Sequence, residues 1–142
     1  MSSHGSSRKQ LQQKLIETIC AGVPDCLSIY RFGSWDTVDE RGDSDIDLAL
    51  LASSPLDPMV RWDLAQKLAS VAKRDVDLVD LLNASVVMRM QVVAHGERVY
   101  SADDNVVERF EDMVFSSYAR LNYERRFILN DVKNRGNIYG EQ

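Results

Sequence analysis

Asp45 and Asp47 are two residues apart at the start of an apolar run, and this spacing suits metal chemistry. Residues 45–51 (DIDLALL) are predicted to form a β-strand. Side chains two apart on a strand share a side, so both aspartates face one way while Ile46 and Leu48 face a core. Neighbouring carboxylates repel each other unless a divalent cation lies between them, and hard oxygen ligands suit Mg²⁺. We therefore predict that Asp45 and Asp47 bind metal and are catalytic.

Asp77 is the third candidate ligand. It lies in residues 75–81 (DVDLVDL), which are also predicted to form a strand. Val76 and Leu78 have the parity of a buried face, so Asp77 has the parity of an active face. Three carboxylates from two neighbouring strands could hold two Mg²⁺ ions about 3.5–4 Å apart, an arrangement used for in-line phosphoryl transfer. The other acids of this segment, Asp75 and Asp80, are expected to be surface or helix-facing charges.

Gly33 and Ser34 follow directly after another predicted strand, residues 27–32 (LSIYRF). A glycine at this position lets the backbone turn sharply and come close to a ligand. The N–H groups that follow, together with the Ser34 hydroxyl, can then surround phosphate oxygens. We predict that this pair binds the phosphates of a nucleotide.

The elements that must position these residues can be read from hydrophobic periodicity and capping signals. The expected elements are a helix at 9–21, strands at 27–32, 45–51 and 75–81, a helix capped by Asp57, a helix from Ser85 to His95 closed by Gly96, a strand at 97–101, and one long or two broken helices over 103–134. This order indicates an α/β (α+β) fold, a small mixed sheet packed by helices with a C-terminal helical arm. We divide the chain into a disordered or tag-like N-terminus (1–8), a catalytic domain (9–102) and a C-terminal helical extension (103–142).

Composition narrows the class of protein further. The chain has 142 residues, enough for one domain, and a formal net charge of −5. Direct binding to nucleic acid is not expected, because it requires a basic surface. Cys20 and Cys26 show no metal spacing, the start lacks the apolar core of a signal peptide, and no run has the length of a membrane span. We therefore expect a cytoplasmic protein with reduced thiols and no membrane association.

The motif as a whole resembles that of a known family. Gly33-Ser34, ten further residues and Asp45-Ile46-Asp47 match the GS-x10-D-x-D signature of the DNA polymerase β-like nucleotidyltransferases. The compact length and the later segment Val76–Val79 resemble the minimal nucleotidyltransferase (MNT) antitoxins, in particular the MntA type encoded beside HEPN-domain toxins. The resemblance covers residues 10–140 and implies the nucleotidyltransferase fold.

The resemblance also implies a function. An enzyme of this type transfers AMP from ATP to a tyrosine hydroxyl of its cognate HEPN toxin, a ribonuclease, and releases pyrophosphate. The modification silences the toxin. The resemblance thus implies ATP as substrate, two Mg²⁺ ions held by Asp45, Asp47 and Asp77, and a heteromeric complex with the toxin.

Three alternatives remain open at this stage. The chain could modify a small molecule such as an aminoglycoside hydroxyl, although a second domain that closes a pocket is missing. It could neutralise a toxin by occlusion alone, although binding would not require clustered acids. Acids at strand ends are also commonly solvated edge charges. Aromatic residues of the last helix, Tyr118, Tyr123 and Phe127, fit core packing and partner contact equally well.

Overall fold

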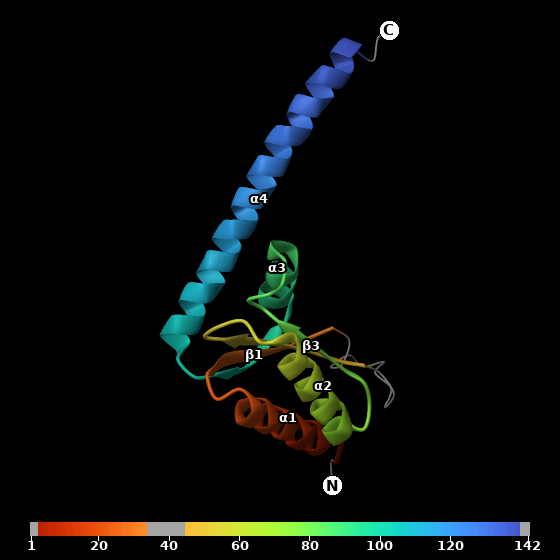
Figure 1. Ribbon diagram of the computed structural model, residues 1–142, viewed down its shortest axis with the longest axis vertical. Helices are drawn as coiled ribbons and strands as arrows, with labels where there is room; N and C mark the ends of the chain where they lie inside the picture. The colour runs from red at the N-terminus through yellow and green to blue at the C-terminus, as the bar shows by residue number, and fades with distance from the viewer. Residues whose placement is uncertain (1–2, 34–44, 140–142) are drawn as a thin grey trace.

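A four-stranded mixed sheet with helices on both faces forms the body of the molecule (Figure 1). The computed structural model describes residues 3–33 and 45–139. Its elements are α1 (Ser3–Gly22), β1 (Cys26–Phe32), β2 (Ile46–Ala52), α2 (Pro58–Ala72), β3 (Val76–Asp80), α3 (Val86–His95), β4 (Glu97–Ser101) and α4 (Asp104–Tyr139). The order of elements along the chain is the predicted one. α1 begins earlier and α4 ends later than the sequence suggested, while the division into three segments stays a prediction.

The strands are arranged in the order β3-β2-β1-β4. β1 is antiparallel to β2 and to β4, whereas β2 and β3 are parallel and in register from Ile46 opposite Val76. β2 is therefore an inner strand, and β3 is an outer strand. This arrangement brings the end of β1 and the starts of β2 and β3 to one edge of the body.

The two faces of the sheet have separate hydrophobic cores. Ile46, Leu48 and Leu50 of β2 pack in one cluster with residues of α1 and α2, such as Leu15 and Leu68. On the other face, a second cluster joins the sheet to α3 and to the first turns of α4; it contains Tyr30, Ala49, Leu51, Val92, Phe110 and Val114. β2 is thus apolar on both faces beyond its first residues, as is typical of an inner strand.

Local signals at the ends of α2 and α3 are confirmed. Asp57 caps α2 by accepting a hydrogen bond from the backbone N–H of Met59 (2.8 Å), and Ser85 caps α3 through the N–H of Met88 (3.1 Å). Lys73 ends α2 in the left-handed conformation, with φ of 59°. Asp57 and Lys73 thus mark the two ends of α2, which connects the end of β2 to the start of β3.

α4 leaves the body as a long single helix (Figure 1). Val107, Phe110 and Val114 bury its first turns against the body, at the spacing of one helix face. Further along, Tyr123 and Phe127 are 70% and 68% exposed. Among the described residues, no helix combines the length and the apolar character that crossing a membrane would require.

Candidate active site

The parallel register of β2 and β3 sets two of the predicted ligands directly side by side. Asp47 pairs with Asp77, and on its other side Asp47 pairs with Phe32 of β1. Neighbouring strands are about 4.8 Å apart, so the two carboxylates can reach one ion. Asp47 is half-buried, while Asp45, just before β2, and Asp77 are exposed. The predicted parity of all three is confirmed by the faces on which their apolar neighbours pack.

Among the described residues, the groups around Asp47 oppose ionisation of its carboxylate. Burial raises the pKa of Asp47, and the nearby charges of Asp77 and Asp45 raise it further. Each of these effects penalises the ionised carboxylate. A bound cation would reverse the balance, because it favours ionised over protonated oxygen ligands.

Gly33 joins the end of β1 to this cluster. Its φ is +80°, a conformation that side-chain-bearing residues rarely adopt, and a Cβ atom placed here would lie 2.1 Å from Oδ2 of Asp47. Only glycine therefore lets the chain turn while touching the Asp47 carboxylate. Ser34, the other predicted phosphate-binding residue, lies outside the described residues.

The donor set fits Mg²⁺, which prefers carboxylate oxygens and keeps several of its waters. Three acids come from adjacent strand starts, and the raised pKa of Asp47 shows that their charges interact. In the part of the chain that the structure describes, no three His, Cys, Asp or Glu side chains already stand together as a metal site.

Asp80 has a role that the sequence did not indicate. It was expected to be a surface or helix-facing charge; at 4% exposed it is not a surface charge, and it faces the segment that leads into α2. Its carboxylate accepts hydrogen bonds from the N–H groups of Leu56 (2.7 Å) and Leu82 (3.2 Å) and from Nδ2 of Asn83 (3.0 Å). Asp80 thus ties the loop before α2 to the turn after β3. No local pattern predicts this, because the partners are joined only by the tertiary fold.

Arg61 is the second residue that the sequence did not single out. It lies in the first turn of α2, and its NH1 donates to the backbone oxygen of Leu78 on β3 (3.2 Å). Together with Asp77 and Asn83 it lines a groove of about 310 Å³ along β3. A lone arginine in a helix usually indicates a solvated face, so only the packing of α2 across β3 reveals this position.

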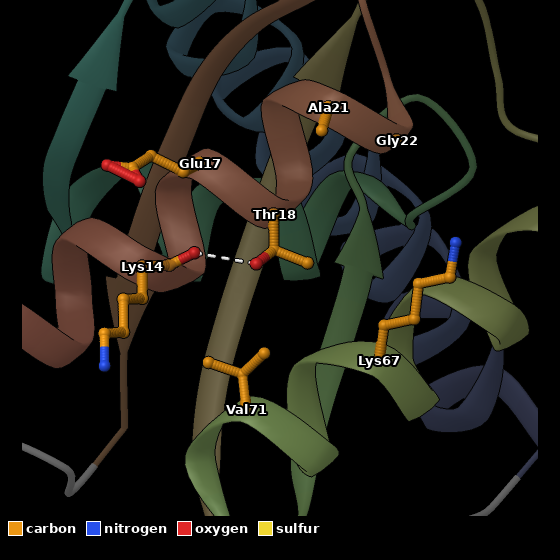
Figure 2. A pocket seen from close by; sticks show the side chains of 7 residues that line it. All are labelled: Lys14, Glu17, Thr18, Ala21, Gly22, Lys67 and Val71. Carbon is orange, nitrogen blue, oxygen red and sulfur yellow. Dashed lines mark hydrogen bonds between the residues drawn. The ribbon is translucent and has the colours of Figure 1, made fainter.

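A second groove, of about 480 Å³, lies between α1 and α2 (Figure 2). Lys14, Thr18, Lys67 and Val71 are among its lining residues, and the Thr18 hydroxyl donates to the backbone oxygen of Lys14 (2.8 Å). These helices cover the face of the sheet opposite to the one that carries Asp47. This groove is therefore separate from the acidic cluster.

The fold agrees with that of known proteins. The family model described as polymerase beta, nucleotidyltransferase, matches residues 13–105. The chain belongs to this nucleotidyltransferase family, and the mixed sheet with its helices confirms the predicted fold class.

Within the family, the chain is similar to protein adenylyltransferase MntA of Shewanella oneidensis, with 41% identity over 85% of this chain and 86% of that protein. It is also similar to a solved structure of a tri-AMPylated HEPN toxin of Shewanella oneidensis in complex with MNT antitoxin (TM-score 0.74, 40% identity, 87% of this chain and 97% of that chain). A toxin–antitoxin structure with AMP-PNP matches equally well (TM-score 0.75, 42% identity, 84% of this chain and 96% of that chain).

Proposed function

We propose that this chain is an antitoxin that transfers AMP from ATP to a tyrosine hydroxyl of a cognate HEPN-domain ribonuclease toxin, releases pyrophosphate and so inactivates the toxin. The relatives support this directly, since one is a protein adenylyltransferase and another was solved with a tri-AMPylated HEPN toxin. The related complex with AMP-PNP supports a nucleotide as the substrate. The structural observation that carries the proposal is the contact of Gly33 with the carboxylate of Asp47, beside Asp77.

The proposed roles of the residues follow from their positions. Gly33 and Ser34 bind the phosphates of ATP, because the turn after β1 adjoins Asp47. Asp77 orients the acceptor hydroxyl and takes its proton. The tyrosine oxygen then forms a bond to the α-phosphorus, the bond from that phosphorus to the bridging oxygen breaks, and pyrophosphate leaves with this oxygen.

Asp45, Asp47 and Asp77 are also the residues that we propose to hold two Mg²⁺ ions. When bound, these ions neutralise phosphate charge and lower the pKa of the acceptor hydroxyl, which is near 10 for a free tyrosine. The charge interactions around Asp47 support this assignment, because they oppose ionisation of the site in its metal-free form.

The C-terminal part of the chain is proposed to bind the partner. Residues 9–102 would form the nucleotidyltransferase domain, and 103–142 the partner-binding extension. Support comes from α4, whose first turns pack on the body while Tyr123 and Phe127 stay exposed. Large aromatic side chains are frequent anchors of protein interfaces.

The proposal is tested by weighing the intact partner after incubation with the chain, ATP and Mg²⁺. We expect a gain of about 329 Da for each AMP transferred. The double variant Asp45→Asn with Asp47→Asn should keep its fold but give no gain, because the electrostatic stabilisation of the transferring group is lost. If the wild-type chain silences the partner without changing its mass, occlusion is the mechanism and the proposal is wrong.

A further inference from the structure

The groove beside β3 adjoins the proposed reaction centre and has no assigned ligand. Its volume is about 310 Å³, and Asp77 lines one part of it while Asn83 and Ala84 line another. Arg61 reaches into it from α2. Since Asp77 belongs both to this groove and to the acidic cluster, a molecule in the groove would lie next to the reacting atoms.

The backbone of β3 presents hydrogen-bonding groups to this groove. β3 is an outer strand of the sheet. The N–H of Ile46 donates to Asp75 and the N–H of Leu81 donates to Leu50, both at 3.0 Å, so odd-numbered residues of this segment face β2. In a parallel pair, the N–H and C=O groups of the intervening residues point away from the neighbour. Val76, Leu78 and Asp80 therefore turn their backbone groups to the outer edge.

Arg61 is the cation of this edge. Its NH1 donates to the outward-facing oxygen of Leu78 (3.2 Å). Among the described residues no carboxylate lies within ion-pair distance of its guanidinium, and Asp80 is engaged by Leu56, Leu82 and Asn83. A guanidinium has five N–H donors, so most of those on Arg61 remain available to a ligand in the groove.

The order of the strands gives the direction from which each reactant enters. Gly33 follows β1, Asp47 lies on β2, Asp77 lies on β3, and the groove lies beyond β3. In-line transfer places the attacking oxygen opposite the leaving group. If the triphosphate is bound on the Gly33 side, its pyrophosphate leaves on that side, and the acceptor must approach from β3.

Building on the function proposed above, we propose that the groove along the outer edge of β3 receives the polypeptide segment of the partner that carries the acceptor hydroxyl. Arg61 is a positioning residue, which donates hydrogen bonds to carbonyl oxygens of this segment. An extended segment could also pair with the outward N–H of Leu78, as peptides do when they add to an exposed sheet edge.

The competing explanation is that Arg61 only shields the edge of the sheet. Charged side chains on outer strands often prevent aggregation. Such a role predicts changes in solubility or stability when Arg61 is replaced, but no selective change in the binding of one substrate.

The two explanations are separated by initial rates of Arg61→Gln with the full partner, varied once in partner and once in ATP concentration. We expect KM for the partner to rise about tenfold or more, a loss of about 1.4 kcal/mol of binding, while KM for ATP changes less than about twofold. Arg61→Lys should restore part of the loss, because it keeps a cationic donor. Lys67→Gln is the matched control: it removes a cation from the same helix but lines the groove between α1 and α2 (Figure 2).

Four outcomes would overturn the inference. An unchanged KM for the partner, or a rise in KM for ATP alone, would show that the acceptor does not use this groove. If Arg61→Gln and Arg61→Lys lose the same amount of activity, and this loss matches a drop in thermal stability, the shielding role would be favoured. A wild-type chain without any transfer activity would instead overturn the proposed function, and the inference with it.

Discussion

Gly33 and Asp47 meet where the phosphate side of the proposed site joins its acids. Gly33→Ala should lower the rate of AMP transfer about a hundredfold, because a Cβ atom 2.1 Å from Oδ2 would displace the Asp47 carboxylate. Initial rates at saturating ATP measure this loss. Gly22→Ala is the control: its Cβ would meet only the flexible end of the Leu64 side chain, at 3.2 Å from Cδ1 and 3.9 Å from Cδ2. If the rate of Gly33→Ala is within about twofold of that of the wild type, the Gly33–Asp47 contact has no role in AMP transfer.

The Asp47 carboxylate should lower the stability of the fold at pH 7. Its pKa in the folded chain is raised by burial and by Asp77 and Asp45, so its stabilising contribution is present below the unfolded pKa and is lost as the pH rises through the folded pKa. At pH 7 the ionised carboxylate therefore destabilises the fold. Asp47→Asn should raise Tm by roughly 1–4 °C at pH 7, and the gap should narrow as the pH falls to about 4.

Magnesium gives a second readout on the same residue. Millimolar Mg²⁺ should raise Tm of the wild-type chain and leave that of Asp47→Asn nearly unchanged, because a ligand stabilises only a state that binds it. Thermal unfolding with and without Mg²⁺ measures both values. A variant that is less stable than wild type at pH 7 would contradict the electrostatic account of the site.

Residue by residue, strand parity predicted which face of the sheet carries the candidate acids, but it did not predict the residues around them. Asp45, Asp47 and Asp77 could be placed on one face because alternation on a strand is a local property. Asp80 and Arg61 could not, because their positions depend on how the loop before α2 and α2 itself pack against β3.

Among the elements, α4 is fixed to the body by a polar contact as well as by its apolar face. The Tyr30 hydroxyl donates to Oε2 of Glu111 (2.6 Å), and NH1 of Arg98 lies 3.7 Å from the same oxygen. Tyr30→Phe should lower the free energy of unfolding by about 1–2 kcal/mol, because Glu111 loses a partner in a half-buried position. Urea unfolding measures the change, and Tyr123→Phe, at an exposed site, should have almost no effect.

Element types could be predicted well because caps and periodicity are strong local signals. Asp57 and Ser85 marked the starts of α2 and α3 correctly. For β2, alternation was only part of the pattern: Ala49 and Leu51 lie on the acidic face and are buried by α3 and α4. On the acidic face, only the residues at the start of β2 remain open to a ligand. The sequence pattern alone did not show this limit.

At the scale of the whole molecule, the position of α4 decides whether its aromatic residues pack in the core or remain open to a partner. Core packing and partner contact seemed equally suitable for Tyr123 and Phe127, and the structure leaves both exposed, at 70% and 68%. The spacing of apolar residues is the same in the buried and exposed halves of α4. The point where burial ends is therefore decided only by how far the body of the molecule extends along the helix.

Replacing Tyr123 and Phe127 by alanine should weaken binding of the partner about tenfold or more, because both lie on one helix face and are large enough to anchor an interface. Isothermal titration with the partner measures the affinity. Arg125→Ala, two residues from each and thus on another side of α4, is the control. Full affinity in the double variant would place the interface elsewhere.

The central claim is that acids from adjacent strands bind metal beside a glycine turn that binds phosphate. Anomalous diffraction from a crystal of this chain grown with AMP-PNP and Mn²⁺, a Mg²⁺ substitute, tests it most directly. We expect metal peaks within about 2.0–2.4 Å of carboxylate oxygens of Asp47 and Asp77, with the phosphates against Gly33. A nucleotide bound elsewhere, or carboxylates that bind no metal in its presence, would contradict it.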